Sequence, residues 1–414
     1  MKTLQTDVAV IGGGCAGMAA AISARREGAE KVLILERSPR LGGVLRQCIH
    51  NGFGVHRFGK DLTGTEFAAA YITQTQKTGI DTLTSTIVLD VTKERTILAM
   101  NREGMLQIKA ASVVIATGCR ERSRGALLIP GTRPAGILSA GTAQRYMNLE
   151  GYLVGRRIVI LGSGDIGLIM ARQFVLEGAQ VLAVAELQPY SSGLTRNIVQ
   201  CVEDFEIPLH YNTTVSRIHG TERVTGVTLV HVDEKRNPLP KTEWFLPCDT
   251  LILSVGLIPE NELAGQAGIP LHPATGGAVV DDAFETEASG IFACGNALHV
   301  HDLADFVTEE SECAGRNAAL FALGRLIGGD IQAVVTDGIG VRGVVPQRIR
   351  AGAEGMVRFQ FRPAQKATHC RTVVYAGGQP VAEKRHMVLM PGEMCEMEVE
   401  RAKLRGDVKV QVEA

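Results

Sequence analysis

The sequence predicts an α/β protein that contains one strand–turn–helix–strand unit twice, followed by a small C-terminal antiparallel β domain. Glycine-rich turns of equal spacing begin at residues 12 and 162, each between an apolar run and a helical pattern. Residues 331–414 instead contain runs in which apolar and polar side chains alternate, as around Val408, Val410 and Val412. Such alternation is typical of strands with one buried face. The length of 414 residues allows two or three domains.

The first unit begins with a short apolar strand at 7–11. The turn after it contains Gly12, Gly14 and Gly17, a helix is expected to about residue 27, and a strand at 31–35 leads to Glu36. In a dinucleotide-binding βαβ unit, the first glycine makes the tight turn and the second lets the backbone approach a pyrophosphate. The third lets helix and sheet pack closely, and the acid accepts hydrogen bonds from a ribose diol. The first unit therefore has the pattern of a dinucleotide site.

The second unit repeats this pattern 150 residues later. Strands are expected at 157–161 and 180–185, with a helix between them to about residue 177. The matching positions are Gly162, Gly164, Gly167 and Glu186. One such motif is a weak signal, whereas two copies with the same spacing to the acid are a strong one. The sequence therefore predicts two Rossmann-like dinucleotide-binding domains.

Later segments complete these two domains. Residues 113–118 and 251–256 are apolar strands that end in glycine turns, and each is expected to add a parallel strand to its own domain. Residues 290–296 form a further strand and turn, followed by a helical pattern from about 305 to 326. We therefore expect one discontinuous domain at 1–122 and 259–330, a second at 123–258, and the β domain at 331–414, with a hairpin turn at 376–379.

Composition excludes several classes of protein. The 43 basic and 44 acidic residues nearly balance, which argues against binding to nucleic acid or to an anionic membrane surface. No apolar run reaches the roughly 18 residues that a membrane span needs. The first eleven residues enter a strand pattern without a signal peptide, and the odd count of nine cysteines favours a cytoplasmic protein. Because the closest cysteines, Cys294 and Cys313, are 19 positions apart, we predict no metal site.

This order of motifs resembles the glutathione-reductase and thioredoxin-reductase superfamily of pyridine nucleotide-disulfide oxidoreductases, over about residues 1–330. The resemblance implies that the first unit binds FAD and the second binds a nicotinamide nucleotide. Asn296 stands where the family usually has Asp, so the position brings no charge. The implied FAD-site residues are Gly12, Gly14, Cys15, Ala16, Gly17, Glu36, Arg37, Gly43, Ala116, Thr117, Gly118, Gly295 and Asn296. The implied nicotinamide-site residues are Gly162, Gly164, Asp165, Ile166, Gly167, Glu186 and Gly256.

The redox dithiol of these enzymes is missing. The Gly-Gly pair at 42–43 is followed only by Cys48, and residues 136–144 contain no cysteine. Residues 129–144 resemble the flavin subunits of heteromeric dehydrogenases, such as the α-type subunits of bacterial proline dehydrogenase, opine oxidase and hydrogen cyanide synthase. Residues 41–54 resemble still more a bacterial branch found beside a glycerol-3-phosphate-dehydrogenase-like subunit. The resemblance therefore implies an oligomer with a second dehydrogenase subunit, through which a small-molecule substrate is oxidised.

Three residues are candidates for catalysis. Cys48 lies in the region that faces the flavin in the family, where a thiol can form a charge-transfer pair or a sulfenate. We favour the alternative that it is a packed cysteine. His50 could donate a proton near the flavin or be a loop histidine, and His301 could be an acid or base oriented by Asp302 or a structural residue. The acids at 309–312 are interpreted as a solvated helix face.

These features leave three hypotheses. The first is an FAD oxidoreductase that passes a hydride between NAD(H) and flavin, as a subunit of a dehydrogenase for glycerol-3-phosphate or a related substrate. The second is a stand-alone NADH oxidase or peroxidase in which Cys48 cycles through sulfenate. The third is a structural subunit with a lapsed nicotinamide site, motivated by Ile169 and Asp165. We favour the first, with NAD(H) rather than NADP(H), because Glu186 would repel a 2′-phosphate.

Overall fold

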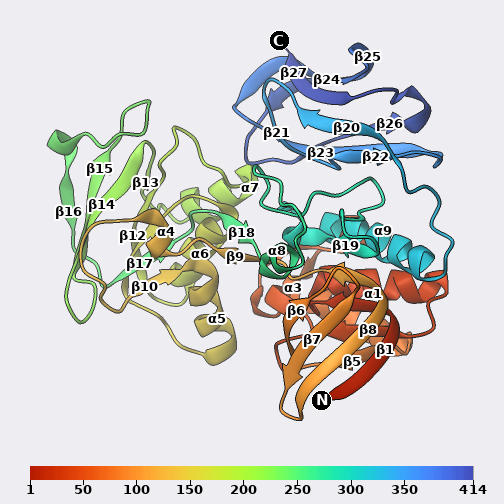
Figure 1. The fold of residues 1–414 in the computed structure, drawn as a ribbon. Helices are drawn as coiled ribbons and strands as arrows, with labels where there is room; N and C mark the ends of the chain where they lie inside the picture. Colours follow the sequence, from red (N-terminus) through yellow and green to blue (C-terminus); the bar gives the residue numbers. More distant parts are fainter. Residues whose placement is uncertain (414) are drawn as a thin grey trace. The chain divides into compact units, whose positions relative to one another are not determined.

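The computed structural model describes residues 1–413, and within them the chain forms two compact units (Figure 1). Unit 1 contains residues 1–46, 51–119 and the chain from 259 onward, and unit 2 contains residues 47–50 and 120–258. The chain passes from one unit to the other in β9 (Cys119–Glu121) and again in β18 (Leu257–Pro259). Residue 414, the last of the predicted β domain, lies outside the described residues. No helix of the described chain has the length and apolar character needed to cross a membrane.

Unit 1 is organised around a mostly parallel sheet. Its order is β5 (Asp81–Leu83), β2 (Val32–Leu35), β1 (Lys2–Ile11) and β8 (Gly104–Ile115), with β19 (Ile291–Ala293) also parallel to β8. Strands β7 (Thr96–Asn101) and β6 (Ile87–Val91) extend the sheet antiparallel to β8. Val10 of β1 pairs with Ile34 on one side and Val114 on the other. The first predicted unit thus lies at the centre of this sheet.

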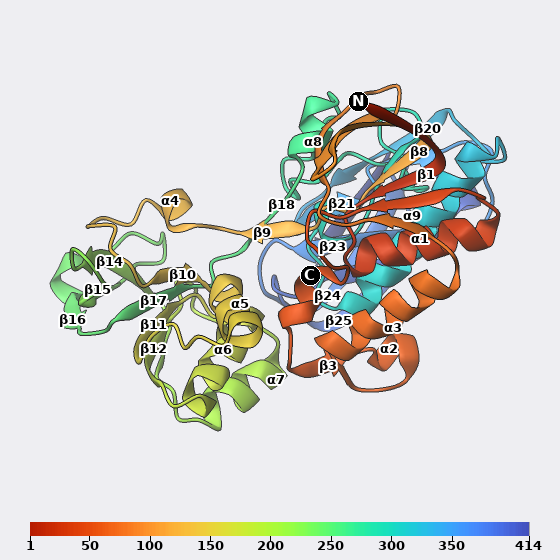
Figure 2. The same ribbon diagram turned by 90° about the horizontal axis from the view of Figure 1, so that it is seen from below.

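Helices α1 (Cys15–Glu27), α3 (Gly64–Lys77) and α9 (Ala304–Ala322) lie side by side on one face of the sheet (Figure 2). Side chains alternate between the two faces of a strand. Ala9 and Ile11 of β1 therefore face the opposite core, where they pack with residues such as Val280 and Ile291. Helices α1 and α9 approach closely, since a Cβ atom at Gly315 would lie 2.0 Å from the Ala20 carbonyl oxygen.

Shorter elements complete unit 1. A two-stranded ribbon joins β3 (Asn51–Phe53) and β4 (Leu62–Thr63), with α2 (Val55–Phe58) between them. Helix α8 (Glu262–Gln266) and the 3-10 turn η4 (Gly295–Ala297) lie in the returning chain, and a further 3-10 turn, η1, spans Gly43–Gln47. Turn η4 directly follows β19 and leads into the loop before α9, which places it at the carboxyl end of the parallel strands.

Unit 2 has its own five-stranded parallel sheet. The order is β10 (Ile137–Ser139), β17 (Thr250–Leu253), β11 (Arg157–Leu161), β12 (Gln180–Ala185) and β13 (Leu209–His210). Helices α5 (Ala140–Glu150) and α6 (Asp165–Leu176) contribute to its apolar core. An antiparallel sheet joins β14 (Thr213–His219), β15 (Gly226–His231) and β16 (Trp244–Leu246). The shorter helices are α4 (Arg124–Leu127), α7 (Thr195–Ile198), η2 (Val199–Glu203) and η3 (Pro240–Thr242).

The tail of unit 1, drawn in blue in Figure 1, is built of strands as predicted. One sheet has the order β22 (Arg348–Arg350), β20 (Ile331–Asp337), β27 (Val408–Glu413), β24 (Ala367–Ala376) and β25 (Gln379–Leu389). The second has the order β21 (Val341–Val345), β23 (Met356–Pro363) and β26 (Cys395–Glu400), and the turn η5 is Arg401–Lys403. The hairpin between β24 and β25 pairs Ala376 with Gln379, as expected. The sheets are not wholly antiparallel, because β20 and β27 run parallel.

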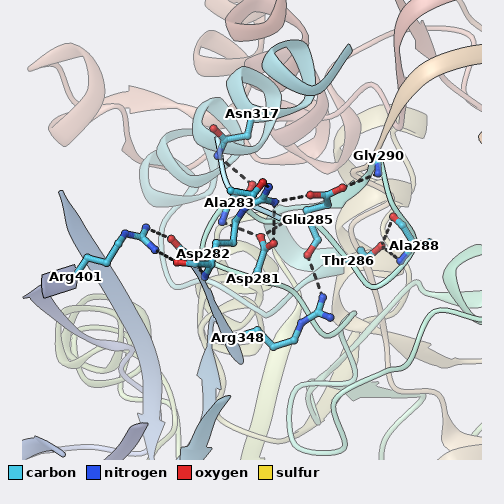
Figure 3. A network of polar contacts seen from close by, with 12 residues as sticks. Asp281, Asp282, Ala283, Glu285, Thr286, Ala288, Gly290, Asn317, Arg348 and Arg401 are labelled. Carbon is cyan, nitrogen blue, oxygen red and sulfur yellow. Dashed lines mark hydrogen bonds and ion pairs between the residues drawn. The ribbon is translucent and has the colours of Figure 1, made fainter. Parts of the chain in front are cut away.

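A buried ionic network joins this tail to the loop at 281–285 (Figure 3). Arg350 lies 3.0 Å from Asp281 and 2.5 Å from Glu285, and its side chain is 4% exposed. Arg401 of η5 pairs with Asp282 in the same loop. Burial raises the pKa of Asp281 to about 6, although Arg350 acts to lower it. The tail is therefore attached through buried carboxylates that two arginines balance, Arg350 for Asp281 and Glu285 and Arg401 for Asp282.

Replacing Arg350 by methionine should destabilise unit 1 by about 3–5 kcal/mol at pH 7, because two buried carboxylates lose their partner. The pKa of Asp281 is about 6 with Arg350 present, and Arg350 acts to lower it, so this pKa should rise further in the variant and protonation should relieve the cost of the unpaired carboxylate as the pH falls. The deficit should therefore shrink as the pH falls from about 7 to about 5. Urea midpoints followed by circular dichroism measure both effects. Arg371→Met, which breaks an exposed ion pair with Glu383, is the control, and an equal loss in both variants would refute this account.

Candidate functional site

The first glycine turn brings the ends of three parallel strands of unit 1 together. The Gly12 N–H donates to the Leu35 carbonyl oxygen, and the Ala116 N–H donates to that of Ile11. Gly12 has φ +109°, and a Cβ atom there would lie 2.3 Å from the Ala116 carbonyl oxygen. At Gly17 a Cβ atom would lie 1.8 Å from the Gly12 carbonyl oxygen. The backbone packing therefore requires glycine at the first and third positions of the motif.

The second glycine of the motif faces open space instead. Gly14 is the N-cap residue of α1, and no side chain caps that helix. A Cβ atom at Gly14 would meet only the Cα atom of Gly43, at 3.9 Å. The first N–H groups of a helix have no intrahelical partner and attract anions. This end of α1 therefore fits a phosphate group of a dinucleotide.

Glu36 lies beside this turn and is 6% exposed. Its Oε2 accepts the Gly13 N–H at 2.7 Å, and its Oε1 accepts the Ser38 N–H at 2.7 Å. An ionised carboxylate offers about four lone-pair positions, so Glu36 can still accept ribose hydroxyls. Arg37 lies at the rim, with a 70% exposed side chain 3.9 Å from Glu260.

Unit 2 repeats this geometry at its own glycine turn. Gly162 has φ +97°, and a Cβ atom there would lie 2.0 Å from the Ser254 carbonyl oxygen. Glu186 accepts the Ser163 N–H at 2.9 Å and the Gln188 N–H at 2.8 Å, just as Glu36 accepts its two N–H groups, and it also accepts the Ser163 hydroxyl at 2.6 Å. Gly164 is the N-cap residue of α6, again without a capping side chain. The two predicted motifs are thus the same structure built twice.

Asp165, the first residue of α6, is held by a neighbouring loop. Its Oδ1 accepts the Leu194 N–H at 2.8 Å and an N–H of the Asn197 side chain at 2.7 Å. Ile166 and Ile169 pack against the apolar core of unit 2. The remaining predicted residue, Gly256, has φ +101° and would have no atom within 4 Å of an added Cβ.

The predicted FAD-site residues that follow β8 and β19 also lie near the first turn. A Cβ atom at Gly295 would lie 2.8 Å from that of Ala16, which places η4 against α1. The Oδ1 of Asn296 accepts the backbone N–H of His301 at 3.0 Å, and its Nδ2 lies 3.6 Å from the Cys119 sulfur. Thr117 donates its hydroxyl to the Glu260 carbonyl oxygen, and Gly118 has φ +76°. Burial raises the pKa of Cys15 to about 11, so its thiol stays protonated.

Cys48 is buried, in the short segment 47–50 that belongs to unit 2. Its sulfur lies 3.7 Å from Oε1 of Gln144, a fully buried residue of α5. Gln47 also donates to Gln144, at 3.2 Å. His50 ends the segment and is half-buried. None of the nine cysteines forms a disulfide in the part of the chain that the structure describes. The amide side chains around Cys48, those of Gln47 and Gln144, were not among the predicted site residues.

His301 has a different partner from the one predicted. Asp302 instead accepts hydrogen bonds from Arg362, at 2.5 Å, and from the Met394 N–H, at 2.7 Å. The interpretation that Asp302 orients His301 is therefore wrong. His301 lies 3.2 Å from Glu310 of α9.

The interpretation of the acids at 309–312 as a solvated face is also wrong for Glu310, which is only 5% exposed. Its Oε2 accepts the Nε2–H of His299 at 2.6 Å, and its Oε1 accepts the Gly295 N–H at 2.7 Å. The signal for this burial was present in the helical spacing, because Val307, Ser311 and Ala314 line the same buried side of α9.

A sequence model of the pyridine nucleotide-disulphide oxidoreductase family matches residues 6–315, which is most of the chain. Among solved structures, thioredoxin reductase of T. acidophilum superposes with a TM-score of 0.63. The superposition covers 77% of this chain and 99% of that one, at 22% identity, and supports the fold alone.

Two curated proteins are similar in sequence. An opine oxidase subunit of Agrobacterium tumefaciens is 26% identical over 339 residues, which are 77% of this chain and 66% of that protein. The HcnB subunit of hydrogen cyanide synthase from Pseudomonas aeruginosa is 26% identical over 341 residues, 76% of this chain and 70% of that protein. The matched part of this chain thus spans about two thirds of the length of these relatives.

The two roles of glycine in the first turn can be separated by substitution. Gly17→Ala should lower stability by about 1–3 kcal/mol or more, because the new Cβ meets backbone atoms that cannot rotate away. Gly14→Ser should change it by less than about 0.5 kcal/mol, since the side chain enters open space and serine is a favoured N-cap residue. Urea unfolding of both variants measures the difference. Equal destabilisation would contradict the packing described for this turn.

Proposed function

Because the chain belongs to the pyridine nucleotide-disulphide oxidoreductase family, we propose that it binds FAD at the first glycine turn and NAD(H) at the second. Members of this family are flavin-dependent oxidoreductases that use pyridine nucleotides. With both groups bound, the nicotinamide and the flavin would supply the chemistry of hydride transfer. The observation that carries the proposal is the equivalent hydrogen bonding of Glu36 and Glu186 beside two uncapped helix N-termini.

At the first turn, the residues of the chain would act by binding and orienting FAD. The uncapped N–H groups of α1 behind Gly14 would receive the pyrophosphate. The Glu36 carboxylate would accept hydrogen bonds from the adenosine ribose. Asn296, at the carboxyl end of β19, would border the ribityl chain, as the family resemblance implies. The backbone N–H of His301 already orients the Asn296 side chain, because it donates to Oδ1.

At the second turn, the side chains favour NAD(H) over NADP(H). The Glu186 carboxylate pairs with a free 2′-hydroxyl but would repel a 2′-phosphate. Residues 187–192 carry no positive charge. Arg172 lies over the ring of Phe205, with its guanidinium carbon 5.9 Å from the ring centroid. Arg196 is an exposed residue of α7. Arg172 is thus engaged with Phe205, and residues 187–192 offer no charge that would compensate a 2′-phosphate.

Electrons would leave or enter through a partner protein rather than a dithiol of this chain. The described residues contain no disulfide. The Cys48 sulfur lies 3.7 Å from the amide oxygen of Gln144. The two similar proteins are named as subunits of an oxidase and of a synthase. We therefore propose that this chain is the flavin subunit of a heteromeric dehydrogenase, whose partner oxidises glycerol-3-phosphate or a related small substrate.

The proposal predicts that NADH reduces the bound flavin faster than NADPH does. At equal concentrations under anaerobic conditions, NADH should lead by about tenfold or more, which corresponds to about 1.4 kcal/mol. Stopped-flow absorbance of the flavin gives both rates. Glu186→Gln should narrow the preference, because the repelling charge is gone, whereas Arg196→Gln should leave it unchanged. Equal or faster reduction by NADPH would overturn the role of Glu186, and no reduction by either nucleotide would overturn the proposed function.

A further inference from the structure

Three side chains that can bind metal ions, two histidines and one glutamate, meet in the interior of unit 1. His299 and His301 come from the loop between η4 and α9, and Glu310 comes from the second turn of α9. One ligand atom of each lies within 4.8 Å of the other two. The three side chains are 5%, 1% and 3% exposed, respectively. The cluster is therefore closed to bulk solvent.

His301 is the residue that the protein alone does not satisfy. Neither of its ring nitrogens has a hydrogen-bond partner among the described residues. Its Nε2 lies 3.2 Å from Glu310 Oε2, the carboxylate oxygen that also pairs with His299 Nε2 at 2.6 Å. Buried polar atoms in native proteins are almost always paired, so an unpaired buried imidazole calls for a ligand.

We propose that His299, His301 and Glu310 bind a divalent transition-metal ion, with Zn²⁺ as the best match. Two imidazole nitrogens and one carboxylate oxygen are a donor set that zinc uses in proteins. At metal–ligand distances of 2.0–2.1 Å, tetrahedral ligand atoms lie about 3.3 Å apart. The spacing between Glu310 and His301 already fits, and that between Glu310 and His299 needs to widen from 2.6 Å.

The surroundings prepare one of these side chains as a ligand. The Gly295 N–H donates to the other oxygen of Glu310 at 2.7 Å, which orients the carboxylate as outer partners of metal sites do.

The ion would have a structural role that does not depend on the proposed function. It would tie the loop at 298–303 to α9, and through the Asn296–His301 hydrogen bond it would also fix η4. The prediction of no metal site was based only on the spacing of the cysteines. This donor set contains no cysteine and uses an acid that was assigned to the surface.

Calorimetric titration of the untagged, chelator-treated full chain with Zn²⁺ tests the site. We expect one equivalent to bind with a Kd below about 1 µM. His301→Gln and Glu310→Gln should each weaken binding by about 100-fold or more, because each removes a ligand. His386→Gln, which replaces a histidine in β25, should bind as the parent does. Absence of saturable binding, or equal binding by all three variants, would overturn the proposal.

A measurement on the parent protein covers the case in which a ligand variant fails to fold. X-ray absorption at the zinc edge should show a first shell of nitrogen and oxygen, with the pattern of two imidazoles. A shell that contains sulfur would place the ion on one of the nine cysteines and would refute the site. The titration and the absorption spectrum are independent of flavin or NADH, so failure of this inference is distinguishable from failure of the proposed function.

Discussion

The close approach of a glycine turn to the carbonyl oxygen of a neighbouring strand is the constraint on which both units depend. A Cβ atom would lie 2.3 Å from the Ala116 oxygen at Gly12, and 2.0 Å from the Ser254 oxygen at Gly162. Only a residue without a side chain lets three parallel strands end together at this distance. The chain then turns into the helix with a φ near +100°, which glycine adopts readily. The turn therefore fixes where each helix begins.

Two further features follow from that turn. The helix N-terminus faces open space at Gly14 and has no capping side chain, so its N–H groups stay available. The acid at the end of the second strand is brought under the turn, where Glu36 accepts one N–H from the glycine loop and one from the residue two positions on. Glu186 does the same in unit 2. An uncapped dipole and an oriented carboxylate on one edge of a parallel sheet are complementary to the phosphates and ribose of a dinucleotide.

Features with a local cause could be predicted from the sequence. The strands at 157–161 and 180–185 appear at those residues, because apolar runs between glycine turns determine them. The hairpin at 376–379 is also confirmed, since a Gly-Gly turn between alternating runs is a local signal. Features that depend on distant partners could not be predicted. The parallel pairing of β20 with β27 joins segments about 70 residues apart, and alternation of side chains does not specify strand direction.

Charged residues give the clearest example of that limit. Glu310 was assigned to a solvated helix face, yet it is buried because two histidines from the preceding loop fold over it. Asp302 was paired with its neighbour His301, but Arg362, 60 residues away in sequence, takes its carboxylate. Arg350 likewise balances acids of a loop 65 to 69 positions earlier. The sequence contains the charges, whereas their partners are chosen by tertiary packing.

The central claim is that the two equivalent turns hold different nucleotides, and a paired substitution tests it most directly. Flavin content and NADH affinity should be measured on purified Glu36→Ala and Glu186→Ala. We expect Glu36→Ala to weaken FAD binding by about 1–3 kcal/mol, as expected when buried ribose hydroxyls lose an acceptor. Glu186→Ala should keep its flavin and lose NADH affinity by a similar amount. Loss of flavin from Glu186→Ala, or unchanged flavin affinity in Glu36→Ala, would contradict the assignment of the two sites.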